Sequence, residues 1–219
     1  MGYMKTDHLY YALHHADTLP KKNVPLLILL HGYGSNEADM LGLGPYFDER
    51  EVNCVSVRAP FQLDTGGFAW FDIERLPDKI RFDYDQAMKS LILLNELVRV
   101  LKIEFESERV IIAGFSQGAT MAMASGFKTP KDYSGIVALS GLCSKQMFPA
   151  DPTLLTGLPV FVSHGIQDEV IPIQQARDSK NLLSSLPVAL DYFEYEMQHT
   201  ISSECLSQLQ NWIFEKLEA

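Results

Sequence analysis

The sequence predicts an α/β fold built on a doubly wound, mostly parallel sheet with helices on both faces. Short apolar runs, many of them β-branched, alternate with helical patterns along the whole chain. The run at residues 24–30 is almost continuously apolar, as expected of a strand that helices cover on both sides. Because no repeat, low-complexity tract or linker interrupts this alternation, we expect a single domain over residues 1–219, with a loose N-terminus at residues 1–8.

The expected strands are short apolar or alternating runs that end in glycine, proline or a polar loop. They lie at residues 9–13, 24–30, 52–57, 109–113, 134–141, 159–164 and 188–195. Helical periodicity is clearest at residues 84–101, and it recurs after residue 118, after Pro172 and at the C-terminus. Parallel strands need crossover connections, and these helical segments supply them.

Composition restricts the classes of partner. The chain carries 28 acidic and 18 basic residues, for a net charge of −10, and it has no basic tract, so we expect no nucleic-acid partner. No stretch is long enough for an integral membrane segment, and the N-terminus lacks a signal-peptide core. The three cysteines have no metal-binding spacing and suit a reducing compartment. We therefore expect a cytoplasmic protein without a metal; a monomer and a homodimer both remain open.

The segment Gly114-Phe115-Ser116-Gln117-Gly118 lies between a predicted strand and a predicted helix. Gly-x-Ser-x-Gly at such a junction is typical of a nucleophile elbow, a sharp turn that lifts the serine hydroxyl clear of the sheet. The bare pattern is only moderately specific, because glycine and serine are common residues. Its place between strand and helix is the stronger signal, and it predicts that Ser116 is a nucleophile.

A serine nucleophile needs a base to take its proton and an acid to orient that base. After an elbow serine, the acid and then the histidine are expected in loops that follow later strands. Asp168 follows the strand predicted at 159–164, and His199 follows the strand predicted at 188–195. The other histidines all precede Asp168 and do not fit this order, whereas Glu169 is an alternative candidate for the acid.

A second glycine-rich loop, His31-Gly32-Tyr33-Gly34, follows the apolar run at residues 24–30. Such a loop can turn a backbone amide toward the elbow serine, although a glycine-rich turn without chemistry has the same sequence. We predict that the amides of Tyr33 and Gln117 form the oxyanion hole, with the helix that starts at the serine adding its positive dipole end.

Together these motifs resemble the carboxylesterase/phospholipase group of α/β-hydrolases, which includes acyl-protein thioesterases. The likeness is carried by residues 30–34, 58–60, 69–72, 114–118, 164–168 and 195–199. It implies an α/β-hydrolase fold with no large lid and no cofactor or metal, which hydrolyses carboxylic esters or thioesters and holds the acyl chain in a hydrophobic groove. One residue departs from the pattern: Gln198 stands where the family often has glycine before the histidine, which puts the conformation of that loop in question.

Two loops, at residues 61–72 and 142–158, are expected to set the depth of the acyl pocket. The predicted substrate-binding residues are Trp70, Phe71, Leu142 and Met147. The predicted function is a serine hydrolase that acts on small-molecule esters or thioesters of short to medium acyl groups through an acyl-enzyme. The alternatives are a lysophospholipase-like lipid-ester hydrolase and a catalytically silent binding protein of the same fold.

Overall fold

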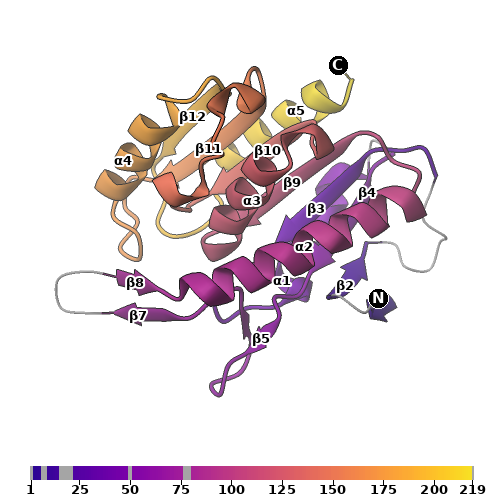
Figure 1. Ribbon diagram of the computed structural model, residues 1–219, viewed down its shortest axis with the longest axis horizontal. Helices are drawn as coiled ribbons and strands as arrows, with labels where there is room; N and C mark the ends of the chain where they lie inside the picture. Colours follow the sequence, from indigo (N-terminus) through magenta and orange to yellow (C-terminus); the bar gives the residue numbers. More distant parts are fainter. Residues whose placement is uncertain (1, 6–8, 15–21, 49–50, 76–79, 219) are drawn as a thin grey trace.

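The computed structural model describes residues 2–5, 9–14, 22–48, 51–75 and 80–218. One eight-stranded sheet runs through it, in the order β1-β2-β4-β3-β9-β10-β11-β12 (Figure 1). The strand bounds are β1 Gly2–Lys5, β2 Tyr10–Leu13, β3 Leu26–Leu30, β4 Asn53–Val57, β9 Val110–Phe115, β10 Gly135–Leu139, β11 Pro159–Gly165 and β12 Ala189–Tyr195. From β4 to β12 all neighbouring strands pair in parallel, whereas β2 is antiparallel both to β4 and to β1.

The first strand differs from the expectation of a loose N-terminus over residues 1–8. Gly2–Lys5 forms an edge strand that pairs with β2, because the β2 backbone offers its free edge to it. Residues 1 and 6–8 lie outside the described part of the chain.

The described part of the chain has five α-helices, of which the first four connect strands and the fifth follows β12. Their bounds are α1 Glu37–Leu41, α2 Tyr84–Glu104, α3 Gln117–Lys128, α4 Ile173–Leu183 and α5 Ser203–Glu218. Short 3₁₀ turns occur at η1 Gly44–Phe47, η2 Pro130–Asp132, η3 Lys145–Met147 and η4 Pro152–Leu155. The segment between β4 and α2 carries two small hairpins, β5 Phe61–Gln62 with β6 Phe68–Ala69, and β7 Ile73–Arg75 with β8 Ile80–Phe82.

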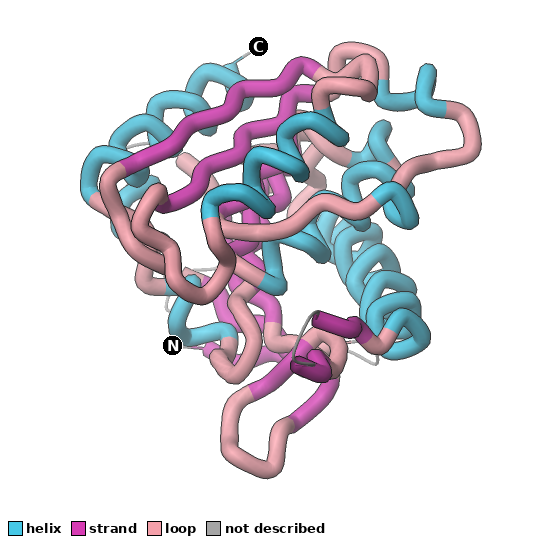
Figure 2. The backbone as a smooth tube through the Cα atoms, turned by 90° about the vertical axis from the view of Figure 1, so that its left-hand side faces the viewer, coloured by secondary structure: helices cyan, strands magenta, loops and turns pink. Residues whose placement is uncertain are grey.

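The sheet separates two hydrophobic cores, as the alternation of side chains along a strand requires. In β3, Leu26, Ile28 and Leu30 pack with α2, α3 and α4, whereas Leu27 and Leu29 pack with α1 and α5. Figure 1 shows α2, α3 and α4 in front of the sheet, and the view in Figure 2 shows helices on both sides of it. The apolar run at residues 24–30 therefore contains a central strand, β3, that is covered on both faces, as expected.

The parallel strands end at the same edge of the sheet, so the loops after β3, β9, β11 and β12 meet there. All the residues predicted to be catalytic follow one of these strands. None of the described helices has the length and apolar content needed to cross a membrane. Cys54, Cys143 and Cys205 are buried free thiols.

Candidate active site

Ser116 joins β9 to α3 in a conformation that few non-glycine residues adopt, with φ 55° and ψ −115°. Two glycines make this turn sterically feasible. A Cβ on Gly114 would lie 2.1 Å from the Gly118 carbonyl oxygen, and a Cβ on Gly118 would lie 2.2 Å from the carbonyl oxygen of Leu30. Backbone strain of this kind costs about 1–3 kcal/mol and is kept only where the surrounding packing enforces it. The turn has the geometry expected of a nucleophile elbow.

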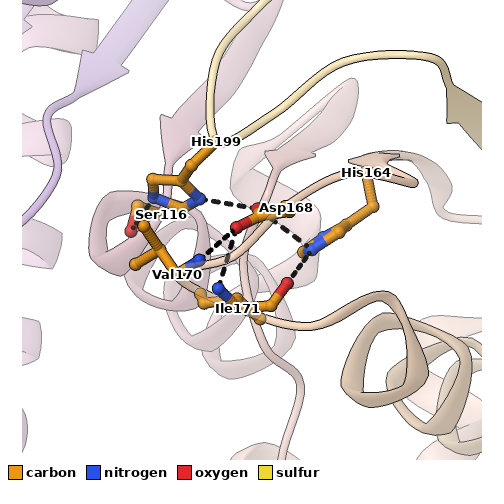
Figure 3. Close-up of polar contacts among 6 residues, drawn as sticks. All are labelled: Ser116, His164, Asp168, Val170, Ile171 and His199. Atoms are coloured by element: carbon orange, nitrogen blue, oxygen red, sulfur yellow. Dashed lines mark hydrogen bonds and ion pairs between the residues drawn. The ribbon is translucent and has the colours of Figure 1, made fainter.

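The three residues predicted to form a triad lie in one chain of hydrogen bonds (Figure 3). His199 Nε2 is 3.0 Å from Ser116 Oγ, and His199 Nδ1 is 2.7 Å from Asp168 Oδ2. With Nδ1–H donating to the carboxylate, Nε2 is free to accept the serine proton. The ring of Phe115 packs on the imidazole with a centroid distance of 4.8 Å, which also restricts its orientation.

Asp168 is the acid that contacts His199. Its side chain is fully buried, and Oδ1 accepts hydrogen bonds from the amides of Val170 at 2.9 Å and Ile171 at 2.8 Å. These hydrogen bonds replace those that the carboxylate loses to water when it is buried. Glu169, the alternative acid, is exposed to solvent. A second histidine, His164, also reaches Asp168, with Nε2 3.2 Å from Oδ2.

The loops that carry Asp168 and His199 are joined through their backbones. Gln167 N donates to the Met197 carbonyl at 3.1 Å, and a Cβ on Gly165 would lie 2.2 Å from that same oxygen. Gln198 is exposed, so its side chain takes no space inside the site. His199 therefore reaches Ser116 even though glutamine replaces the usual glycine before it.

The glycine-rich loop after β3 lies directly against the elbow. A Cβ on Gly32 would lie 3.3 Å from the Ser116 Cβ, and Gly34 N donates to the Phe68 carbonyl at 2.9 Å, which ties the loop to the β5–β6 hairpin. Among the described residues, no protein oxygen accepts the Tyr33 amide. The Gln117 amide lies in the first turn of α3, where amides have no acceptor within the helix. Both amides predicted for the oxyanion hole thus belong to segments that border Ser116.

His31 holds the glycine-rich loop in place through two hydrogen bonds of its ring. Its buried ring donates from Nδ1 to the Gly32 carbonyl at 2.7 Å and accepts the Ala59 amide on Nε2 at 3.0 Å. Burial lowers the pKa of His31, which favours the neutral ring that this pattern of donor and acceptor requires.

The side chain of Gln117 has a role that the sequence did not reveal. It is buried, its Oε1 accepts the Trp70 amide at 2.8 Å, and its Nε2 donates to the Phe71 carbonyl at 2.6 Å. Both partners are 46 or 47 residues away in the chain. The only signal in the sequence was that Gln117 and the Trp-Phe-Asp segment occur together in the same family.

The prediction that Trp70 binds substrate is wrong. Its side chain has no exposed surface, because the indole packs beside His31 and donates from Nε1 to the His31 carbonyl at 2.9 Å. Ser90 Oγ donates to the Trp70 carbonyl at 2.5 Å from α2. Trp70 therefore anchors the loop at residues 61–72 in the core instead of lining a pocket.

A cleft of about 900 Å³ lies between α2, α3, α4 and the loop at residues 142–158. Phe71, Leu142 and Met147, three of the residues expected to bind substrate, lie in its wall. Its apolar wall also includes Met88, Leu91, Met121, Ala124, Phe127 and Phe148. None of the three triad side chains is part of the wall. The cleft starts at Thr120, one helical turn after Ser116, and extends along α3 away from the elbow.

Cys143 lies in the cleft wall, and burial raises the pKa of its thiol to about 12, so this group stays protonated near neutral pH. Within the described ranges, no group of three or more histidine, cysteine, aspartate or glutamate side chains is placed to hold a metal ion.

Comparison with known proteins agrees with this architecture. Residues 17–216 match the Phospholipase/Carboxylesterase family. The chain is 31% identical over 215 residues to acyl-protein thioesterase 1 of Saccharomyces cerevisiae, which covers 88% of this chain and 93% of that protein.

Solved structures show the same fold. The crystal structure of esterase PE8 superposes with a TM-score of 0.76 at 26% identity, covering 90% of this chain and 96% of the esterase. The carboxylesterase of Bacillus cereus superposes with a TM-score of 0.79 at 23% identity, covering 96% of this chain and 95% of that chain. The chain therefore has the α/β-hydrolase fold, belongs to the phospholipase/carboxylesterase family and is a carboxylic ester hydrolase.

Proposed function

We propose that this enzyme cleaves carboxylic esters or thioesters through an acyl-enzyme on Ser116, with His199 as general base and Asp168 as the group that fixes His199. The observation that carries the proposal is the unbroken hydrogen-bond chain from Ser116 Oγ through the imidazole to Asp168 Oδ2. A pure binding protein has no need of such a chain, which argues against the silent alternative.

The reaction divides into two acyl transfers. Ser116 Oγ attacks the carbonyl carbon while its proton passes to His199 Nε2, and the tetrahedral intermediate then expels an alcohol or thiol that takes this proton. Water attacks the acyl-serine in the second half, with His199 again accepting and returning the proton. Asp168 stabilises the imidazolium in both halves.

The developing oxyanion is stabilised by the amides of Tyr33 and Gln117. The loop of Tyr33 borders Ser116, and Gln117 starts α3, whose N-terminal dipole end favours negative charge. A well-placed donor of this kind contributes about 3–4 kcal/mol to transition-state stabilisation.

The acyl chain occupies the cleft that starts one turn beyond Ser116. Phe71, Leu142 and Met147 would contact it, and Gln117 fixes the backbone of Phe71 relative to the elbow. Small-molecule esters or thioesters of short to medium acyl groups fit this arrangement. The yeast relative is named an acyl-protein thioesterase, which supports thioesters among the substrates.

The size of the cleft favours a second candidate, a lipid-ester hydrolase. The apolar wall continues along α3 to Phe127, eleven residues after Ser116 and so about 16 Å along the helix axis. A wall of that length accepts longer chains than the first candidate requires.

Hydrolysis of p-nitrophenyl esters from acetate to palmitate, together with labelling by a fluorophosphonate, tests the proposal. Wild type is expected to turn over esters and to be labelled, while Ser116→Ala loses both, because it lacks the nucleophile. The position of the chain-length optimum separates the two candidate functions. A folded wild-type protein with neither turnover nor labelling would support the silent binding protein instead.

A further inference from the structure

We propose that His164 is a positioning residue for the reaction, which holds the Asp168 carboxylate in the orientation that His199 needs; this inference rests on the proposed function. Chain order alone predicts no role for His164, because it lies before the acid in the chain. In the structure it is a second imidazole on the same carboxylate, opposite His199 (Figure 3).

The contacts of His164 assign its proton. Nε2 lies 2.8 Å from the Ile171 carbonyl oxygen and 3.2 Å from Asp168 Oδ2, and both of these atoms are acceptors. Nδ1 is buried and contacts no donor or acceptor in the described part of the chain. The neutral ring with its proton on Nε2 donates its hydrogen bond to the Ile171 carbonyl and turns the positive N–H edge toward Asp168 Oδ2. A second proton on Nδ1 would be a buried donor without an acceptor.

The donors to Asp168 are divided between its two oxygens. Oδ1 accepts the amides of Val170 and Ile171, and Oδ2 accepts His199 Nδ1–H. His164 Nε2 lies 3.2 Å from Oδ2 as a polar neighbour, while its hydrogen bond goes to the Ile171 carbonyl. Without His164, the amide bonds hold only Oδ1, and the carboxylate can rotate to move Oδ2 away from His199. His164 also fixes the Ile171 carbonyl, so it holds the turn that presents both amides.

Burial makes this arrangement stiff. The side chains of His164 and Asp168 are both 0% exposed, so water does not replace a lost donor without a change in packing. His164 is carried by β11, whose parallel pairing with β10 and β12 fixes its backbone. A rigid strand therefore sets the position of the acid, which itself lies on a loop.

Three substitutions separate positioning from packing. His164→Phe keeps a ring of similar size and removes the donor. His164→Gln places an amide NH₂ near the position of Nε2, whereas His164→Asn places it near Nδ1, where no acceptor lies. Steady-state hydrolysis of a p-nitrophenyl ester, urea unfolding and the low-field ¹H NMR signal of the His199 Nδ1 proton are measured for each full-length variant.

We expect kcat to fall by at least about tenfold in His164→Phe and His164→Asn, with KM unchanged, and His164→Gln to recover most of the wild-type kcat. The low-field proton signal should persist in wild type and His164→Gln and broaden in the other two. If His164→Phe does not fold, the pair of His164→Gln and His164→Asn decides.

Two results would overturn the proposal: folded donor-free variants with wild-type kcat and an unchanged proton signal, or glutamine and asparagine variants that are equally impaired. Failure of the proposed function is distinguishable from both, because wild type itself would then show no turnover. In that case the NMR comparison still reports whether His164 orders the carboxylate.

Discussion

The side-chain oxygen of Gln117 accepts the backbone amide of Trp70 at 2.8 Å, so the residue after Ser116 directly holds the loop at residues 61–72. Its NH₂ group donates in turn to the carbonyl of Phe71, which lines the cleft between α2, α3 and α4. One side chain therefore sets the distance between the reacting serine and the first wall of the pocket, while its own amide faces the oxyanion position in the proposed mechanism.

Gln117→Leu should destabilise the protein by about 2–4 kcal/mol. The substitution leaves the buried Trp70 amide and Phe71 carbonyl without partners, and each such group costs about 1–3 kcal/mol. We also expect lower kcat/KM on long-chain esters than on acetate, because the Phe71 backbone is released. Urea unfolding and the ester series measure the two effects.

Gln86→Leu is the matched control. Gln86 likewise accepts a backbone amide and donates to an oxygen, in both cases on Asp72, but this pair is exposed to solvent. Water replaces the lost bonds there, so the expected loss is below about 1 kcal/mol. Equal losses in the two variants would contradict the role assigned to Gln117.

Asp168→Asn should reduce kcat by about 10⁴-fold, as replacement of a triad aspartate by asparagine does elsewhere, because the amide disfavours the required tautomer of His199. Glu169→Gln should keep wild-type kcat, since Glu169 is exposed whereas Asp168 is the carboxylate bonded to His199. A large loss in Glu169→Gln beside near-normal turnover in Asp168→Asn would reverse the assignment of the acid.

The sequence predicted those parts of the site that depend on local pattern. Ser116 was marked by the glycines on either side, and Asp168 and His199 by their places after apolar strand-forming runs. The contacts that it did not predict join residues far apart in the chain. No local pattern shows that the ring of Trp70 is buried beside His31, and the side chain of Gln117 reaches across 47 residues to the Trp70 amide. Chain order excludes His164 from the triad, although the turn at residues 165–168 brings its ring to 3.2 Å from the Asp168 carboxylate.

Arg58→Met should lower the free energy of unfolding at neutral pH by about 3 kcal/mol. This is the low end of the range for breaking a buried ion pair, and it applies here because the Arg58 side chain is 27% exposed. Its guanidinium forms two hydrogen bonds to the Glu37 carboxylate, which is 2% exposed, and lies over the ring of Phe68. Removing it leaves a buried charge unpaired. Arg81→Met is the control, because its pair with Glu74 is exposed and worth at most about 1 kcal/mol.

The contribution of Glu37 to stability should depend on pH. Burial alone raises the pKa of its carboxyl, but the hydrogen bonds and charge of Arg58 outweigh burial and hold the pKa below the ordinary value of 4.5. A lowered pKa in the folded state means that the stabilisation is complete above that value and is lost as the pH falls through the folded-state pKa. Urea unfolding from pH 7 to pH 3 should therefore show wild type losing its advantage over Glu37→Gln below about pH 4.5. A constant difference across this range would contradict the ion-pair account.

Ala124→Phe should shorten the acyl chain that the enzyme prefers. Ala124 is half-buried in the cleft wall, eight residues after Ser116 and so about 12 Å along α3. A phenyl ring there fills the path of a long chain but does not reach an acetyl group held at the serine. We expect kcat/KM for palmitate to fall by at least about tenfold while that for acetate changes little.

Ala189→Phe serves as the matched control for this last substitution. Ala189 is exposed at the start of β12, at the opposite end of the strand from the loop that carries His199, so the same added ring should leave the whole ester series unchanged. An Ala124→Phe profile identical to wild type would mean that the acyl chain leaves Ser116 in another direction. A parallel fall for every ester would instead indicate that the added ring disturbs the elbow itself, and urea unfolding of the variant would then show the loss of stability.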